Sequence, residues 1–311
     1  MSWPGKVACI IMRITLFGRN GQVGRELAPL LAGLGTLAAL DRGDVDLEQP
    51  EAIRAALRRE RPDIVVNAAA YTAVDRAESE PDRARRVNAE AVGVMADEMA
   101  RRGGWLVHYS TDYVFDGTKP SGYLETDPTG PLNVYGETKL AGEQLVATSG
   151  CRHLIFRTSW VYAAHGHNFL RTMLRLLGER EDLAVVDDQI GAPTAASRIA
   201  GITADVIRGL AATNPASGVY HLAAAGATSW HGYAEFIAAT ARARGCDLRA
   251  AADRIGRQPS SALAQPARRP AHSLLDTTKL RRTFGAVLPR WQEDVAAVVA
   301  ALLTEPQASP A

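Results

Sequence analysis

Several features that mark specialised classes of protein are scarce in this chain of 311 residues. It has three cysteines, Cys9, Cys151 and Cys246, and their wide separation provides neither a CxxC motif nor a disulfide framework, so we expect reduced thiols. The formal net charge is +1, which creates no general field for nucleic acid or an acidic membrane. We therefore expect no nucleic-acid partner, no membrane partner and a cytoplasmic location.

Long apolar runs are also missing. The stretch from Val7 to Phe17 is too short to span a bilayer, contains Arg13 and precedes no small-residue cleavage site, so it indicates a first strand. Residues 1–11 are expected to be an extension or a disordered lead that the fold does not need. A hydrophobic content of 47% with 22% charged residues is ordinary for a globular protein.

A glycine-rich turn follows the first strand and precedes apolar residues at helical spacing. Its pattern is GxxGxxG, and strand, glycine turn and helix in this order predict a pyrophosphate site. Glycines let the backbone approach the phosphates, and the helix leaves its first amides free to bind the anion. We expect cofactor contacts from Gly18, Asn20, Gly21, Gln22, Val23 and Gly24.

Strand and helix patterns alternate after this turn. Strands are predicted over 35–41, 63–67 and 105–110, and a helical stretch over 83–99. This alternation predicts an α/β fold with a Rossmann-type doubly wound parallel sheet, in which ligands bind at the carboxyl ends of the strands. Further cofactor contacts are therefore expected from Asp46, Leu47, Ala69, Ala70, Tyr71, Thr72 and Tyr109.

Asp41 ends the second predicted strand, about twenty residues past the glycine turn, and Arg42 follows it. An acid at this place accepts hydrogen bonds from the ribose hydroxyls of NAD, whereas an adjacent arginine pairs with the additional phosphate of NADP. Both residues are candidate cofactor ligands, and a solvated turn is the alternative. The sequence leaves the choice between NADH and NADPH open.

Tyr135 and Lys139 lie four residues apart, so both side chains project from one face of a helix. There the ammonium can lower the pKa of the phenol, which then becomes a usable acid near neutral pH. Thr111 is placed at the end of the strand predicted over 105–110. We expect Thr111, Tyr135 and Lys139 to be the catalytic residues of a hydride-transfer site, the last two also touching the cofactor.

These motifs, with residues 67–70 and 110–112, resemble those of the extended short-chain dehydrogenase/reductase family. Within the family, the strings 66–75, 108–117, 131–136, 156–162, 188–194 and 268–273 are similar to those of dTDP-4-dehydrorhamnose reductases. The likeness extends from about Met12 to Trp291. It implies that NADPH or NADH reduces the C4 ketone of dTDP-4-dehydro-L-rhamnose, in nucleotide-sugar and cell-surface polysaccharide biosynthesis.

The resemblance also implies roles for single residues. Thr111 would hold the ketone oxygen, Asp112 would bind the sugar beside it, and Trp160 would contact the deoxysugar, with a plain core aromatic as the alternative for Trp160. Tyr113 stands where sugar-nucleotide 4,6-dehydratases have a second acid, so elimination lacks its general base. An epimerase or another reductase of this family, and a non-catalytic regulatory subunit that binds the cofactor, are the alternative functions.

A smaller, interleaved substrate-binding domain is expected from the second half. Residues 12–165 would form mainly the NAD(P)-binding domain and 166–311 mainly the substrate domain, with about 193–222 returning to the first. Helices are predicted over 168–175, 233–237 and 295–303, a strand over 218–222 and a frayed tail over 304–311. Arg268 and Arg269 are a candidate diphosphate site, an exposed loop being preferred.

Histidines are present but show no ligand spacing on one element, and ketone reduction with a tyrosine acid needs no metal. We therefore assign no metal-binding residue. The sequence leaves open a structural Mg2+ and a homodimer.

Overall fold

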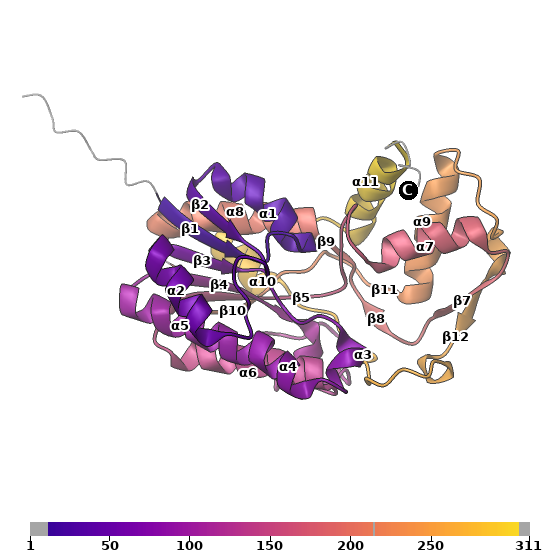
Figure 1. The fold of residues 1–311 in the computed structure, drawn as a ribbon. Coiled ribbons are helices and arrows are strands. Elements are labelled where there is room, and N and C mark those ends of the chain that lie inside the picture. Colours follow the sequence, from indigo (N-terminus) through magenta and orange to yellow (C-terminus); the bar gives the residue numbers. More distant parts are fainter. Residues whose placement is uncertain (1–11, 214, 305–311) are drawn as a thin grey trace, which may run out of the picture.

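A six-stranded parallel sheet is the centre of the computed structural model, which describes residues 12–213 and 215–304. Its strand order is β10-β5-β4-β3-β1-β2 (Figure 1). The chain runs from β1 to β2 on one side and then crosses back to β3 on the other side of β1. The topological switch point therefore lies between β1 and β3. The strands are β1 (Met12–Phe17), β2 (Gly35–Leu40), β3 (Ile64–Asn67), β4 (Trp105–Thr111), β5 (Arg152–Thr158) and β10 (Gly218–His221).

The predicted Rossmann-type fold is confirmed, and helices cover both faces of the sheet (Figure 1). Leu27 and Leu31 of α1 (Gln22–Ala32) form one core with Ile199 of α8 (Ala196–Thr213). On the other face, Ile53 of α2 (Pro50–Glu60) and Met95 of α5 (Ala91–Arg102) form a second core. Burial of both faces explains why the strands are continuous apolar runs. Residues 1–11 lie outside the described part of the chain.

The helical stretch predicted over 83–99 is present, but its middle turn is wider than an α-helix. It comprises α4 (Pro81–Arg85), a π-helical turn over Arg86–Glu90 and α5. Asn88 in this turn accepts a hydrogen bond from the backbone N–H of Tyr71 (2.8 Å) and donates to its carbonyl (3.1 Å). Such π-helical turns are frequent at functional sites, and here the turn holds the segment that follows β3.

A second, smaller region lies beyond the carboxyl ends of the strands (Figure 1). Its helices α9 (Trp230–Ala243) and α11 (Trp291–Thr304) contain the predicted helices 233–237 and 295–303, and α7 (Phe169–Glu179) matches the one predicted over 168–175 except that Asn168 is its N-cap. They share a core of their own through Leu170, Ile237 and Val295. Two short strand pairs complete the region: β7 (Leu183–Val186) with β12 (Ile255–Gln258), and β8 (Ile190–Gly191) with β11 (Thr228–Ser229).

The two regions are interleaved along the chain. β6 (Val161–Tyr162) pairs with β9 (Thr194–Ala195), and α8 then packs against α1. The strand predicted over 218–222 is β10, which pairs in parallel with β5 from Gly218 opposite Leu154 to His221 opposite Arg157. Leu280 of α10 (Thr278–Phe284) also joins the first core, a return to the sheet that the sequence did not indicate.

Side-chain contacts tie the smaller region to the first helix of the sheet. Asn168 donates to the Gln22 carboxamide oxygen (2.9 Å), and His165 Nε2 lies 3.0 Å from Glu26. The N-terminus of α1 therefore faces both regions. Among the described residues, no helix has the length and apolar character needed to cross a membrane.

The start of α1 is packed directly on the glycine turn. Gly18 has a φ of +84°, and the N–H of Gly21 bonds to its carbonyl oxygen (3.0 Å). A Cβ on Gly24 would lie only 2.0 Å from that same oxygen. The turn therefore tolerates no side chain at position 24, because the neighbouring atom is backbone and has no room to shift.

We expect Gly24→Ala to lower the free energy of unfolding by about 2–4 kcal/mol, since it forces α1 away from the turn. Gly201→Ala in α8 is the matched control, because a Cβ there meets no atom within 4 Å. That change should raise stability by about 0.5–1 kcal/mol through helix propensity. Urea unfolding of both variants measures the difference, and equal stabilities would show that the close approach is not a constraint.

Candidate active site

A cavity of about 620 Å³ opens where β1, β2, β3 and β4 end, at the switch point of the sheet. Every residue predicted to touch the cofactor lines it except Gly24, which is buried beneath the turn. The predicted residues in its wall are Gly18, Asn20, Gly21, Gln22, Val23, Asp41, Arg42, Asp46, Leu47, Ala69, Ala70, Tyr71, Thr72, Tyr109, Tyr135 and Lys139. Glycine backbone and alanine side chains leave room in this wall for an extended dinucleotide.

Several residues of the wall were missed by sequence reasoning. They include Glu48, Arg83, Thr158, Val161 and His167. Thr158 and Val161 belong to a string that resembled the family, which was a usable signal. Glu48 and Arg83 carry no local motif, because their place in the wall depends on how two distant segments pack together.

The carboxylate of Asp41 has its partners within the chain. Arg19 donates to Oδ2 through Nε (3.1 Å) and Nη2 (2.8 Å), Asn20 donates to the same oxygen (2.6 Å), and the N–H of Gly43 donates to Oδ1 (2.7 Å). The hydrogen bond from Gly43 and the Arg19 guanidinium lower the pKa of Asp41. Asp41 is therefore an anchored carboxylate, and Arg19 is positioned by it at the edge of the cavity.

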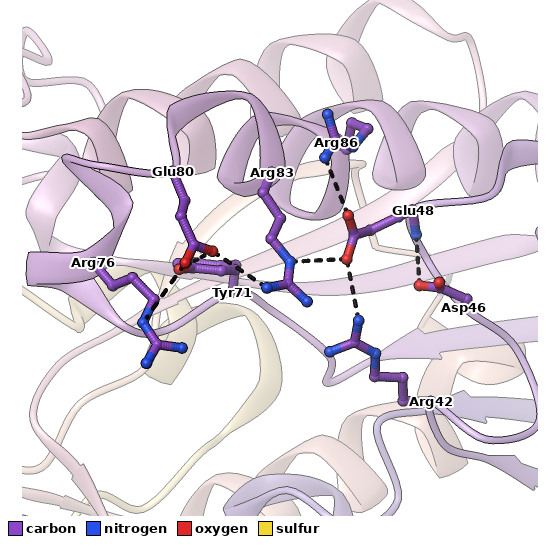
Figure 2. A network of polar contacts seen from close by, with 8 residues as sticks. All are labelled: Arg42, Asp46, Glu48, Tyr71, Arg76, Glu80, Arg83 and Arg86. Atoms are coloured by element: carbon purple, nitrogen blue, oxygen red, sulfur yellow. Dashed lines mark hydrogen bonds and ion pairs between the residues drawn. The ribbon is translucent and has the colours of Figure 1, made fainter.

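Arg42 turns the other way, toward a group of ion pairs beside the cavity (Figure 2). Its Nη2 atom lies 3.2 Å from Glu48 Oε1, and its side chain is 70% exposed. Arg83 also reaches Glu48 (2.9 Å), and it links this carboxylate to that of Glu80 (3.3 Å). Glu80 in turn accepts from the Tyr71 hydroxyl (2.9 Å), so the network holds one wall of the cavity.

Tyr135 lies in the first turn of α6 (Val134–Thr148), which is fixed at its start by two contacts. Asn133 caps the helix by accepting from the N–H of Gly136 (2.8 Å), and a Cβ on Gly136 would lie 2.2 Å from the Tyr113 carbonyl oxygen. Burial raises the pKa of Tyr135 to about 12; a hydrogen bond with the Thr111 hydroxyl lowers it and the charge of Asp112 raises it. The phenol is therefore protonated at neutral pH, as a proton donor must be.

Lys139 is 1% exposed, and its partners lie on β4. Its Nζ atom donates to the Tyr109 carbonyl (2.5 Å) and lies 3.2 Å from His108 Nε2. Burial lowers the pKa of Lys139 to about 8, while the charge of Glu143 raises it. The expectation that Lys139 lowers the pKa of Tyr135 is not supported, because burial, Thr111 and Asp112 account for that pKa.

His108 connects Lys139 to β3. Asn67 accepts from the N–H of Ala69 (3.1 Å) through its carbonyl oxygen, so its NH2 group faces His108 Nδ1 (3.2 Å). A neutral imidazole has one acceptor nitrogen, so its tautomer decides whether the ring accepts from Asn67 at Nδ1 or from Lys139 at Nε2. Burial and the nearby Lys139 hold the pKa of His108 well below its ordinary value, so the ring is neutral.

Thr111 and Asp112 are buried side by side where β4 ends. The Thr111 hydroxyl donates to Asp112 Oδ1 (3.0 Å) and accepts from the N–H of Tyr113 (3.2 Å). Burial raises the pKa of Asp112 to about 7, against the hydrogen bonds of the Ser273 and Thr111 hydroxyls. Neither residue lines the dinucleotide cavity, but the hydrogen bond of Thr111 with Tyr135 places both beside the phenol.

Trp160 also lies outside the cavity wall, immediately before Val161, which lines it. Its φ is +47°, an uncommon value for a bulky residue, and its indole stacks on that of Trp230 at 3.6 Å between ring centroids. Trp230 donates to Gln189 (3.1 Å). Tight packing thus fixes the strained backbone of Trp160 at the junction of the two regions.

Arg268 is exposed in a loop, as expected, but the side chain of Arg269 in the same loop is not free. Arg269 donates to both carboxylate oxygens of Asp75 (3.1 and 2.9 Å), and its side chain is 17% exposed.

Among the described residues, no group of His, Cys, Asp and Glu side chains could hold a metal ion. Cys151 and Cys246 are free thiols, and Cys9 lies outside the described residues.

Because folding raises the pKa of Asp112, ionisation of this carboxylate should lower the free energy of unfolding. The pKa of Asp112 is higher in the folded chain than in the unfolded one. Its protonated form therefore contributes fully to the free energy of unfolding below about pH 4, and this contribution is lost as the pH rises through about 7. Asp112→Asn removes this ionisation. Relative to the unsubstituted protein, we expect its stability advantage to be about 2–3 kcal/mol larger at pH 8 than at pH 5.

Denaturant unfolding at the two pH values measures this difference. A constant difference would show that Asp112 ionises as readily in the folded chain as in the unfolded one.

A family model described as the RmlD substrate binding domain matches residues 12–304. The dTDP-4-dehydrorhamnose reductase of Burkholderia thailandensis is 53% identical over 298 residues, which are 94% of this chain and 100% of that protein. The enzyme of the same name from Shigella flexneri is 50% identical over 297 residues, covering 94% of this chain and 99% of that protein.

Solved structures agree with these matches. The Bacillus anthracis dTDP-4-dehydrorhamnose reductase in complex with NADP superposes with a TM-score of 0.85 at 32% identity, covering 96% of this chain and 100% of that one. The Streptomyces venezuelae dTDP-glucose 4,6-dehydratase, with NAD bound, has a TM-score of 0.77 at 17% identity over 94% of this chain and 98% of that one. The second likeness shows only a shared fold.

Proposed function

The chain belongs to the RmlD substrate-binding-domain family of dTDP-4-dehydrorhamnose reductases, and we propose that it reduces the C4 ketone of dTDP-4-dehydro-L-rhamnose to dTDP-L-rhamnose. NADPH supplies the hydride for this reduction when bound. The observation that carries the proposal is the position of Tyr135 and Lys139 in the wall of the same cavity as the glycine turn.

The cavity fits a dinucleotide on two observations. A Cβ on Gly18 would meet the backbone N of Ala69 at 2.7 Å, so the turn and the β3 segment approach each other as bare backbone. The N-terminus of α1 begins at this point and offers its free amides to a pyrophosphate. Gly18, Gly21 and Ala69 would hold the phosphates and Lys139 the nicotinamide ribose.

Tyr135 is the proposed proton donor to the ketone oxygen. Its neutral phenol is available at physiological pH, so negative charge on the oxygen is met by a proton as it develops. Thr111 would hold the same oxygen, and Asp112 and Trp160 would contact the sugar. The hydrogen bond from Lys139 to the Tyr109 carbonyl holds the amine at the wall of the cavity.

Elimination is disfavoured by the residue after Asp112. Tyr113 occupies this place, and its ring meets that of Tyr135 edge to face, 5.8 Å between centroids and 78° between planes. A phenol whose pKa is raised by burial is no general base at neutral pH. The site therefore supports simple reduction better than dehydration.

NADPH is preferred by the charges at the adenine end of the cavity. Asp41 already has partners for both carboxylate oxygens, so it is a poor acceptor for additional ribose hydroxyls. Arg42 lines this end and pairs with Glu48, and Arg19 pairs with Asp41 beside it; their side chains are 70% and 41% exposed, so both guanidinium groups remain accessible. Two arginines around an engaged carboxylate favour the 2′-phosphate.

We propose the division of the chain already described, with residues 12–165 mainly for the cofactor and 166–311 mainly for the substrate. The cores of the two regions and the return of α8 and β10 to the sheet support it. A cytoplasmic location and a homodimer remain predictions.

Oxidation of NADPH by the purified protein should depend on dTDP-4-dehydro-L-rhamnose, and it should be slower with NADH at equal concentration. Loss of absorbance at 340 nm follows the reaction, with dTDP-glucose as the control substrate because it has no C4 ketone. Binding of NADPH without any turnover of the ketone would favour a regulatory subunit and contradict the proposal.

Tyr135→Phe removes the proton donor but keeps the ring. We expect kcat to fall by about 10²–10⁴-fold, the usual contribution of a positioned acid, while the Kd of NADPH changes by less than about threefold. Steady-state kinetics and fluorescence titration measure the two quantities. Near-normal kcat would remove Tyr135 from this role.

A further inference from the structure

Glu48 is a charged residue of the cavity wall to which neither the catalytic site nor the glycine motif assigns a role. It follows β2 by several residues and is placed beside the π-helical turn by Arg83 and Arg86 (Figure 2). Its side chain is 16% exposed, and its own N–H donates to Asp46 (3.1 Å). This single carboxylate lies among three guanidinium groups.

The three arginines depend on Glu48 to different degrees. Arg83 also pairs with Glu80 (3.3 Å), and Arg86 reaches Glu48 Oε2 at 3.1 Å from the helix behind it. Arg42 has Glu48 Oε1, at 3.2 Å, as its ion-pair partner, and it is the most exposed of the three. Arg42 is also the one that directly follows Asp41, at the ribose position.

Glu48 remains ionised at neutral pH. Burial raises its pKa, but the hydrogen bonds and charges of Arg83 and Arg86 outweigh burial and hold the pKa below its ordinary value. A permanent negative charge in the wall therefore repels an anionic group bound beside Arg42. An approaching phosphate must also break the ion pair of Arg42 before that guanidinium can turn to it.

We propose that Glu48 determines the degree of cofactor discrimination: it holds Arg42 away from the 2′-phosphate of NADPH and so limits the preference for NADPH over NADH. This inference rests on the proposed dinucleotide site. It concerns a residue that would not touch the reacting atoms and acts through Arg42. NADH has no phosphate at this place, so Glu48 should matter little for its binding.

The test is Glu48→Gln, which keeps the size of the side chain and removes its charge. Fluorescence titration of the full chain, without sugar substrate, should show NADPH binding tightened about five- to tenfold and NADH binding changed less than twofold. Glu51→Gln is the matched control, because Glu51 is 83% exposed and pairs with Arg54 on α2. It carries the same change in net charge and should alter neither affinity.

A double substitution tests the route through Arg42. In an Arg42→Gln background, Glu48→Gln should improve NADPH binding by less than twofold, because no guanidinium is left to release. Unchanged or weaker NADPH binding in Glu48→Gln alone, or equal gains for both dinucleotides, would overturn the proposal. So would a full gain without Arg42.

These outcomes are separate from that of the proposed function, which is tested by turnover of the ketone. A protein that binds NADPH but reduces no sugar would lose the proposed activity and keep the assignment of Glu48. Failure of the unsubstituted protein to bind either dinucleotide would overturn both.

Discussion

The close approach of α1 to the end of β1 is the constraint on which the rest of the site depends. Because Gly24 leaves no space for a Cβ beside the Gly18 carbonyl, the helix starts directly at the turn and its free amides face the cavity. Gln22, the first residue of the helix, then accepts a hydrogen bond from Asn168 of the smaller region. One contact between backbone atoms therefore fixes both the phosphate site and the position from which the sugar-binding region is reached.

Much of the sheet could be predicted from the sequence because its strands are buried on both faces and are short apolar runs with turns between them. β5 was not recognised as a strand, and its composition explains why. Arg157 is buried in it and is neutralised by Glu143, 2.6 Å away on α6. An ion-pair partner on another element allows a charged residue to be buried in the sheet. The sequence around that residue does not reveal the partner.

The candidate site was predicted where its residues belong to contiguous motifs, and not where they are brought together by packing. Gly18, Tyr135 and Lys139 were found from the spacing of two motifs and from the strand, glycine turn and helix around the first of them. Arg83 reaches the cavity only because α4 packs beside the loop that carries Glu48, and Lys139 contacts His108 and the Tyr109 carbonyl of β4. Spacing places two side chains on one helix face, but the partner of each is decided by the strand against which that face packs.

Charge is distributed unequally along the cavity, and this division matches the chemistry that each end must perform. At the reacting end, burial favours the uncharged forms of Tyr135, His108 and Asp112, and it lowers the pKa of Lys139 to about 8. A ketone reduced by hydride and proton becomes a neutral alcohol, so this end needs a proton donor rather than permanent charge. At the adenine end, ionised side chains such as Glu48 are held by hydrogen bonds and meet a ligand that is itself charged. Charge therefore recognises the ligand at one end of the cavity, and proton transfer takes place at the other. The buried surroundings that favour proton transfer are thus kept away from the ion pairs at the adenine end.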